Sequence, residues 1–167
     1  EEWANVIVNG QPEDRIRRIE NVTGSKANDR ITGDDSVNIL RGEDGDDWLK
    51  GGGGDDTLVG GYGSDTADYS AYFLPIVATL DENNATRVFV GGVPGDTLHE
   101  VENLYGGFGK DRLLGDYHGN TLHGGKGADI LGGGFGDDIF LYTSLSDSGP
   151  DEATRDVIMD FNGKGTD

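Results

Sequence analysis

Apolar residues recur every nine positions along two stretches of the chain, a spacing that fits neither a helix nor a simple alternating strand. Five consecutive nine-residue units occupy residues 24–68, and four more occupy residues 106–141. The eighth position of every unit is apolar, with Ile31, Leu40, Leu49, Leu58, Ala67, Leu113, Leu122, Leu131 and Phe140. A short strand with one inward-pointing side chain is therefore predicted at positions seven to nine of each unit.

Glycine and acidic residues fill the rest of each unit in a fixed order, as in GGGGDDTLV at residues 51–59. Glycine and aspartate disfavour helices and favour turns, so the first six positions are predicted to form a loop. Two units then make one coil of a flattened spiral, with loops stacked along its edges. The sixth position is Asp or Asn in every unit, with Asp29, Asn38, Asp47, Asp56, Asp65, Asp111, Asn120, Asp129 and Asp138.

A longer repeat surrounds the nonapeptides, because residues 6–24 align without gaps on residues 88–106 at an offset of 82. Between the arrays, IVATLD (76–81) and TRVFVGG (86–92) predict two strands, with DENNA (81–85) as the turn between them. The chain is therefore divided into lead-in strands at 1–23, a first array at 24–68, a connecting β segment at 69–105, a second array at 106–141, and a C-terminal flank at 142–167 that is expected to be truncated.

Composition points to a cation as the partner. The 167 residues include 32 acidic and 13 basic ones, for a formal net charge of -19, which argues against nucleic acid and anionic membrane surfaces. The chain has no cysteine, so neither disulfides nor thiolate metal sites can stabilise it. No apolar run reaches transmembrane length, and EEWANVIVNG at 1–10 lacks the features of a signal peptide.

Stacked loops would bring carboxylates and carbonyl groups together, and a flexible shell of oxygen ligands is what Ca²⁺ prefers. Zinc or copper would favour His or Cys, which the units rarely offer. Without a cation the stacked aspartates would repel one another, so calcium binding is predicted to supply folding free energy. If each ion lies between a loop and the loop two units later, five loops give three sites and four loops give two, about five ions in all.

The unit GGxGxDxUx, in which U is a large apolar residue, resembles the calcium-binding repeat of the RTX, or haemolysin-type, family of type I-secreted bacterial proteins. The run DVIMDF at 156–161 is similar to a segment that commonly follows such arrays. The resemblance implies an all-β fold, with two right-handed parallel β-rolls joined here by a short antiparallel β segment. It also implies that the position-six side chains ligate calcium together with carbonyl groups at positions two and four, which are those of Gly52, Gly54, Gly61, Gly63, Gly107, Gly109, Gly125, Gly127, Gly134 and Gly136.

Three units depart from the repeat, because those beginning at residues 24, 33 and 115 have Ala27, Ser36 and His118 at position four instead of glycine. Two of the three also have asparagine at position six, which can ligate calcium but carries no charge. We expect weaker or missing sites there. The acidic residues at position five are expected to be solvated, and they are Asp46, Asp55 and Asp137.

These observations predict a non-catalytic module that folds on calcium binding outside the cell and supports the secretion and stability of a larger secreted bacterial protein. The resemblance implies type I secretion and covalently attached domains. One alternative is an adhesin or polysaccharide-binding repeat that uses exposed aromatic residues, namely Trp48, Tyr62, Phe108 and Phe135, although packing against flanking structure is favoured for Trp48. Another is the C-terminal part of a secreted protease, lipase or alginate epimerase, yet the sequence contains no GxSxG, HExxH or Walker motif and no catalytic residue is predicted.

Overall fold

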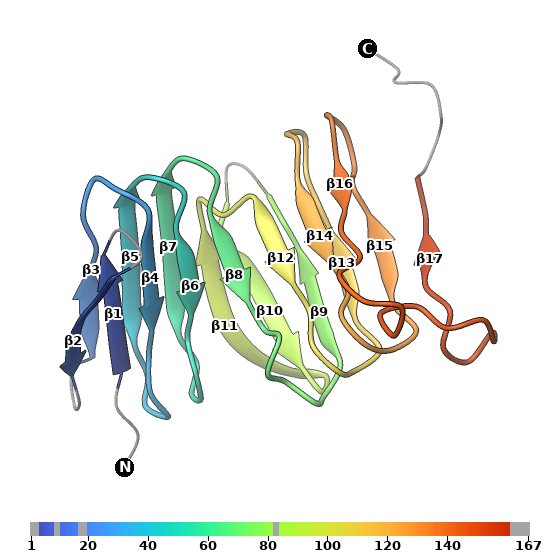
Figure 1. Cartoon of the computed structure of the whole chain (residues 1–167), viewed down its shortest axis with the longest axis horizontal. Helices are drawn as coiled ribbons and strands as arrows, with labels where there is room; N and C mark the ends of the chain where they lie inside the picture. The colour runs from blue at the N-terminus through green and yellow to red at the C-terminus, as the bar shows by residue number, and fades with distance from the viewer. Residues whose placement is uncertain (1–3, 9–10, 17–19, 82–83, 161–167) are drawn as a thin grey trace.

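The computed structural model describes residues 4–8, 11–16, 20–81 and 84–160, and within these ranges it contains strands but no helix. Two sheets run side by side along the long axis of the molecule (Figure 1). The other residues, which belong to the predicted lead-in, the DENNA turn and the C-terminal flank, lie outside the described residues; they are 1–3, 9–10, 17–19, 82–83 and 161–167. The predicted all-β fold is confirmed.

Each sheet is assembled mainly from alternate short strands of the two arrays. Sheet A has the order β16 (Ile139–Phe140), β14 (Thr121–His123), β12 (Asn103–Tyr105), β8 (Thr66–Asp68), β6 (Trp48–Lys50), β4 (Asp29–Thr32), β1 (Ala4–Val8) and β2 (Gln11–Ile16). Sheet B has the order β17 (Val157–Ile158), β15 (Ile130–Gly132), β13 (Arg112–Leu114), β9 (Ile76–Thr79), β10 (Thr86–Val90), β11 (Val93–His99), β7 (Thr57–Tyr62), β5 (Ile39–Asp44) and β3 (Asn21–Thr23).

Neighbouring array strands are parallel and differ by two units in sequence. Strand β4 pairs with β6 so that Ile31 lies beside Leu49, and β5 pairs with β7 so that Leu40 lies beside Leu58. Two units therefore make one coil, as predicted for parallel β-rolls. Both sheets pass through both arrays, so the two rolls form one continuous stack.

The connecting segment supplies the antiparallel strands. Strand β10 pairs antiparallel with both β9 and β11, in agreement with the two strands predicted between the arrays. Strand β11 then pairs parallel with β7 of the first array, and β9 pairs parallel with β13 of the second. The antiparallel hairpin of β1 and β2 occupies the same place in the 82-residue repeat as β10 and β11.

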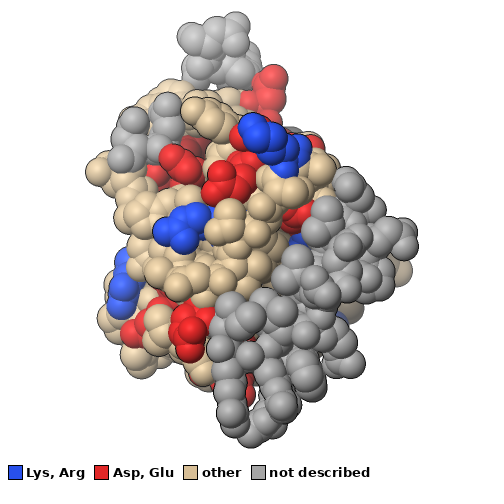
Figure 2. Space-filling view, turned by 90° about the vertical axis from the view of Figure 1, so that its left-hand side faces the viewer, with Lys and Arg blue, Asp and Glu red and all other residues tan. Residues whose placement is uncertain are grey.

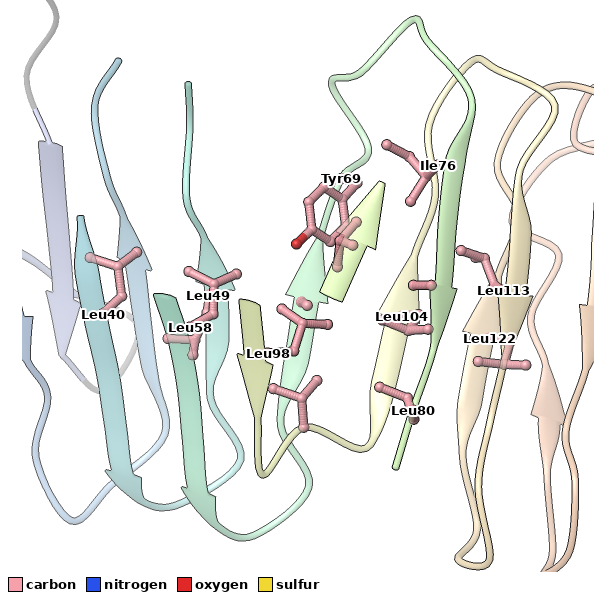
Figure 3. Close-up of a cluster of buried hydrophobic side chains, with 14 of the residues drawn as sticks. Leu40, Leu49, Leu58, Tyr69, Ile76, Leu80, Leu98, Leu104, Leu113 and Leu122 are labelled. Carbon is pink, nitrogen blue, oxygen red and sulfur yellow. The ribbon is translucent and has the colours of Figure 1, made fainter. Parts of the chain in front are cut away.

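The core is a ribbon of aliphatic side chains between the sheets (Figure 3). Eight of the nine position-eight residues have no exposed surface, and Phe140, near the end of the stack, is partly buried against the others. The connecting segment continues the ribbon with Tyr69, Ile76, Leu98 and Leu104, each at most 1% exposed. A single row of inward side chains is thus shared by the arrays and the segment that joins them.

Candidate metal centre

The loops of units that begin 18 residues apart lie directly on one another. A Cβ built on Gly54 would contact the backbone of Ser36, and one on Gly127 would contact the backbone of Gly109. The backbone itself links the loops, because Gly53 donates an amide hydrogen bond of 2.9 Å to the Asp34 carbonyl. The stacking required for a site shared by two loops is therefore present in both arrays.

The position-six side chains are buried between these stacked loops rather than solvated on the surface. Eight of the nine are at most 3% exposed, and Asp138 is partly buried. Carboxylates are rarely buried unless they are paired or bind a cation. Their placement is therefore that of ligands or hydrogen-bond acceptors, and it is not that of a solvated acidic face.

One oxygen of most of these carboxylates accepts an amide from the neighbouring coil and so helps to hold the coils together. The Asn38 amide donates to Oδ1 of Asp56 at 2.8 Å, and the Asp47 amide donates to Oδ1 of Asp65 at 2.8 Å. The same 18-residue link joins Asp29 to Asp47, Asp111 to Asp129, and Asn120 to Asp138. The position-six residues thus form a ladder along each edge of the roll.

The second oxygen of many of these carboxylates is buried without a hydrogen-bond partner within the described residues. This holds for Oδ2 of Asp47, Asp56, Asp65 and Asp129, and for Oδ1 of Asp29. An unsatisfied buried acceptor costs about 1–3 kcal/mol, and more when it is charged. A row of such oxygens is the feature that a hard, oxygen-seeking cation would stabilise, so the donor set fits Ca²⁺.

Burial shifts the titration of these carboxylates in the ion-free protein. Desolvation raises the pKa of Asp56, Asp65 and Asp129 to about 7, against the lowering effect of the amide that each accepts. The pKa values of Asp47 and Asp111 are also raised, again mainly by desolvation. At neutral pH the folded chain without a cation therefore holds buried charge at a cost in free energy.

We expect the calcium-depleted protein to gain β structure and resistance to urea as the pH falls from 8 to 5. A carboxylate with a folded pKa of about 7 and an unfolded pKa of about 4 stabilises the folded state fully below about pH 4, and this contribution is lost as the pH rises through about 7. Urea unfolding followed by circular dichroism in calcium-free buffer measures it. In saturating calcium the gain should disappear, because ligation requires the ionised form.

The predicted carbonyl ligands lie in the stacked loops, and eight of the ten glycines have positive φ. Gly107 and Gly109 do not, and these two lie against the connecting segment, on the backbone of Tyr72 and Leu74. Two of the predicted carbonyl groups also accept hydrogen bonds: that of Gly52 from the Tyr72 hydroxyl, and that of Gly107 from the Lys126 amide at 2.8 Å. The remaining members of the predicted carbonyl set are Gly54, Gly61, Gly63, Gly125, Gly127, Gly134 and Gly136.

The loop at residues 69–75 interrupts the column of nonapeptide loops between the arrays. It lies on the loop of residues 51–56 through the Tyr72 hydroxyl, and the Phe108 amide of the next loop donates to the Tyr72 carbonyl at 2.8 Å. Tyr69 is buried, and its ring packs edge-on against Tyr72 at 5.4 Å between centroids. A segment without the nonapeptide pattern therefore lies between two nonapeptide loops, and Tyr72 contacts both of them.

Three acidic residues continue the ladder although they lie outside the predicted nonapeptides. Asp96 accepts the Asp56 amide at 2.9 Å, Glu102 accepts the Asp65 amide at 2.8 Å, and Asp156 accepts the Asp129 amide at 2.9 Å. Oδ2 is also buried in Asp96 and in Asp156, and the hydroxyl groups of Tyr69 and Tyr142 lie close to these two carboxylates. The available signal was an apolar residue two positions later in each case, namely Leu98, Leu104 and Ile158, and for Asp96 also the Gly91-Gly92 pair at positions one and two of the same unit.

The position-five residues Asp46, Asp55 and Asp137 are exposed, as expected. Trp48 is half-buried and donates from Nε1 to Asp68 at 2.7 Å, with its ring edge-on to Tyr105. Its packing agrees with the favoured interpretation and leaves it poorly placed to bind glycan.

The other aromatic residues considered for glycan binding remain exposed, with Tyr62 at 84%, Phe135 at 57% and Phe108 at 43%. Phe108 stacks on Phe73 at 4.7 Å, and Phe135 stacks on Tyr117 at 5.1 Å. These pairs bridge neighbouring loops, so packing between loops accounts for the stacking.

The described part of the chain contains no group of three or more His, Cys, Asp or Glu side chains suited to a metal ion. Sites built from one or two carboxylates and several carbonyl groups agree with this result. Among the same residues no helix is long and apolar enough to cross a membrane.

Comparisons with known proteins extend these observations. The family described as peptidase M10 serralysin C terminal matches residues 27–167, which include the connecting segment, the second array and nearly all of the first. Among solved structures, the extracellular lipase LipA from Serratia marcescens is similar at 19% sequence identity and a TM-score of 0.42. That similarity covers 77% of this chain and 31% of the lipase, so the chain spans about a third of the lipase's length. A comparison with curated protein sequences gave no match.

Proposed function

Because the chain belongs to the peptidase M10 serralysin C-terminal family of RTX-type calcium-binding β-roll repeats, found in secreted extracellular proteins, we propose that it is a module that folds on calcium binding outside the cell. The observation that carries the proposal is the ladder of buried position-six carboxylates, each with one oxygen in a hydrogen bond and many with the other unsatisfied. A fold with this feature is costly without a cation and stable with one.

We place about five ions between stacked loops, in line with the 18-residue spacing of the ladder. Three ions lie in the first array: one between the loops that begin at residues 24 and 42, one between those at 33 and 51, and one between those at 42 and 60. Two lie in the second, between those beginning at 106 and 124, and 115 and 133. When bound, Ca²⁺ would supply the positive charge that the buried carboxylates lack.

The chain's own residues determine how strongly each site binds. Each position-six aspartate contributes a charge, and five of the seven also have an unsatisfied oxygen, whereas Asn38 and Asn120 contribute a neutral amide. The sites that use these two asparagines are therefore the weaker ones. Loop carbonyl groups at positions two and four complete each shell.

This arrangement acts as a switch between compartments. In a cytosol poor in calcium, self-repulsion at a net charge of -19 and the cost of the buried carboxylates keep the chain unfolded, a state suited to export through a type I channel. Outside the cell, millimolar calcium fills the sites and drives folding by mass action. The module is non-catalytic in this proposal, and it stabilises attached domains of a larger secreted protein.

We expect a cooperative change from coil to β structure when the calcium-depleted chain is titrated with Ca²⁺ up to about 10 mM, and no such change with Mg²⁺. Magnesium requires near-ideal octahedral geometry and gives up its water reluctantly, so loops rich in carbonyl groups should discriminate against it. Far-UV circular dichroism follows the transition, and calorimetry counts about five ions. Full β structure in chelator, unchanged by calcium, would contradict the proposed function.

A further inference from the structure

Both sheets end at the N-terminal side of the molecule in strands with one unpaired edge. Within the described residues, β2 pairs only with β1, and β3 pairs only with β5. We call the outer edges of β2 and β3 the N-terminal edge, and Figure 2 looks onto this end of the molecule, where basic and acidic side chains both reach the surface. Unpaired edge strands are templates for further strand pairing.

The 82-residue repeat shows what binds to such an edge. The strands β11 and β12 correspond residue for residue to β2 and β3, and their equivalent edges are fully paired. Strand β11 pairs parallel with β7, and β12 pairs parallel with β8, so the end of the first array is seated on them. The Thr97 amide donates to the Asp56 carbonyl at 2.8 Å, and the Asn103 amide donates to the Asp65 carbonyl at 2.9 Å.

The acidic side chains that accept backbone amides from the last two loops of the first array are present in both copies of the repeat. Asp96 and Glu102 accept the amides of Asp56 and Asp65, the last two position-six residues of the first array. Their counterparts at the same offset are Asp14 and Glu20, although the two copies differ at eleven of the nineteen aligned positions. Glu20 is exposed, so its carboxylate is available to an incoming strand.

The sequence that separates β2 from β3 is basic, which favours an acidic partner. Three of the 13 basic residues of the chain fall within four positions of the sequence, as Arg15, Arg17 and Arg18, whereas the second copy of the repeat has Thr97, His99 and Glu100. The loops of a nonapeptide array are strongly acidic, as GEDGDD at 42–47 and GGGGDD at 51–56 illustrate. Opposite charges of this kind favour association of the correct partners.

From these observations we propose that the N-terminal edge is a docking surface for the end of a further nonapeptide roll joined on the N-terminal side of β1. The last two strands of that roll pair parallel with β2 and β3, and the amide of its last position-six residue donates to Glu20. The two sheets and the apolar ribbon then continue without a break from one roll to the next.

The test is a fusion in which a copy of residues 24–82 precedes the complete chain 1–167, which reproduces the spacing between the first array and β10. In saturating calcium, we expect the amides of Arg15 and Asn21 to exchange with deuterium about tenfold or more slowly than in the unfused chain. Glu20→Ala should reverse much of this protection in the fusion. The same variant should leave the calcium midpoint of the unfused chain unchanged, because Glu20 is exposed there.

Three results would overturn the proposal. In the first, the added array folds with calcium while Arg15 and Asn21 exchange as fast as in the unfused chain, so the rolls are independent. In the second, the added array stays unfolded at calcium concentrations that fold the rest, so β2 and β3 are not an adequate template. In the third, sedimentation shows that the unfused chain associates through this edge in calcium, so the occupant is a second copy.

Discussion

Replacing Asp56 with asparagine is expected to raise the calcium concentration at which the chain folds by roughly tenfold or more, and to lower the number of bound ions. In the unsubstituted chain the Asn38 amide donates to Oδ1 of Asp56 at 2.8 Å. Asparagine keeps an oxygen that can accept this hydrogen bond, so the ladder is retained. The substitution removes the negative charge and converts the buried, unsatisfied Oδ2 into a neutral amide. Calcium affinity depends strongly on ligand charge, and a tenfold change corresponds to about 1.4 kcal/mol.

Asp55→Asn is the matched control, because it removes the same charge one residue away in the same loop. Asp55 is exposed and makes a long ion pair of 4.0 Å with Arg87, so its loss should change the midpoint less than about twofold. Calorimetric titration of both variants measures the ion count and affinity. Equal effects of the two changes would mean that net charge governs folding, and they would contradict a ligand role for position six.

Much of the fold could be predicted because one side chain per unit determines it. Position eight is apolar in every unit, and burial of eight of those nine residues at 0% exposure follows from their spacing. The family match confirms the resemblance of the nonapeptides to RTX repeats. The carboxylate ladder could also be anticipated at position six, since Asp or Asn there keeps register with the apolar position.

The joint between the arrays could not be predicted in the same way. Asp96 and Glu102 complete the ladder from the connecting segment, where the repeat is only partly kept. Asp96 follows Gly91 and Gly92 but has Pro94 at position four, and Glu102 has no glycine at positions one, two and four of its unit. The contact of the Tyr72 hydroxyl with the Gly52 carbonyl joins residues 20 apart by stacking, and no local pattern encodes it. Both features arise from tertiary packing between coils.

The role of the first glycine of each unit also emerged only from the structure. Glycines at positions two and four were expected to supply carbonyl ligands, whereas position one proves to be limited by space. A Cβ on Gly51 would overlap Oδ2 of Asp56 and lie 2.8 Å from its Cγ. The same collision with the position-six side chain of the unit recurs at Gly24, Gly33, Gly42, Gly60, Gly106, Gly115, Gly124 and Gly133.

Gly51→Ala is therefore expected to destabilise the calcium-bound chain by about 2–4 kcal/mol, the sum of overpacking and of the ladder hydrogen bond that a displaced Asp56 would lose. The loss should be accompanied by about one fewer bound ion, because the displaced carboxylate is a proposed ligand. Urea unfolding at fixed calcium gives the free energy of unfolding, and calorimetry gives the ion count. The net charge is unchanged, so any effect comes from geometry alone.

Gly53→Ala supplies the control within the same loop, since a Cβ there would meet the flexible Asp35 side chain at 3.1 Å and the Asp35 Cα at 3.3 Å. The Gly53 amide would keep its 2.9 Å hydrogen bond to Asp34, and the cost should stay below about 1 kcal/mol with the ion count unchanged. Similar effects at both glycines would mean that the loop relaxes around a methyl group at either position. The requirement for glycine at position one would then have a cause other than contact with the position-six carboxylate. The close packing of Gly51 against Asp56 would no longer support the proposed position of the ligand oxygen.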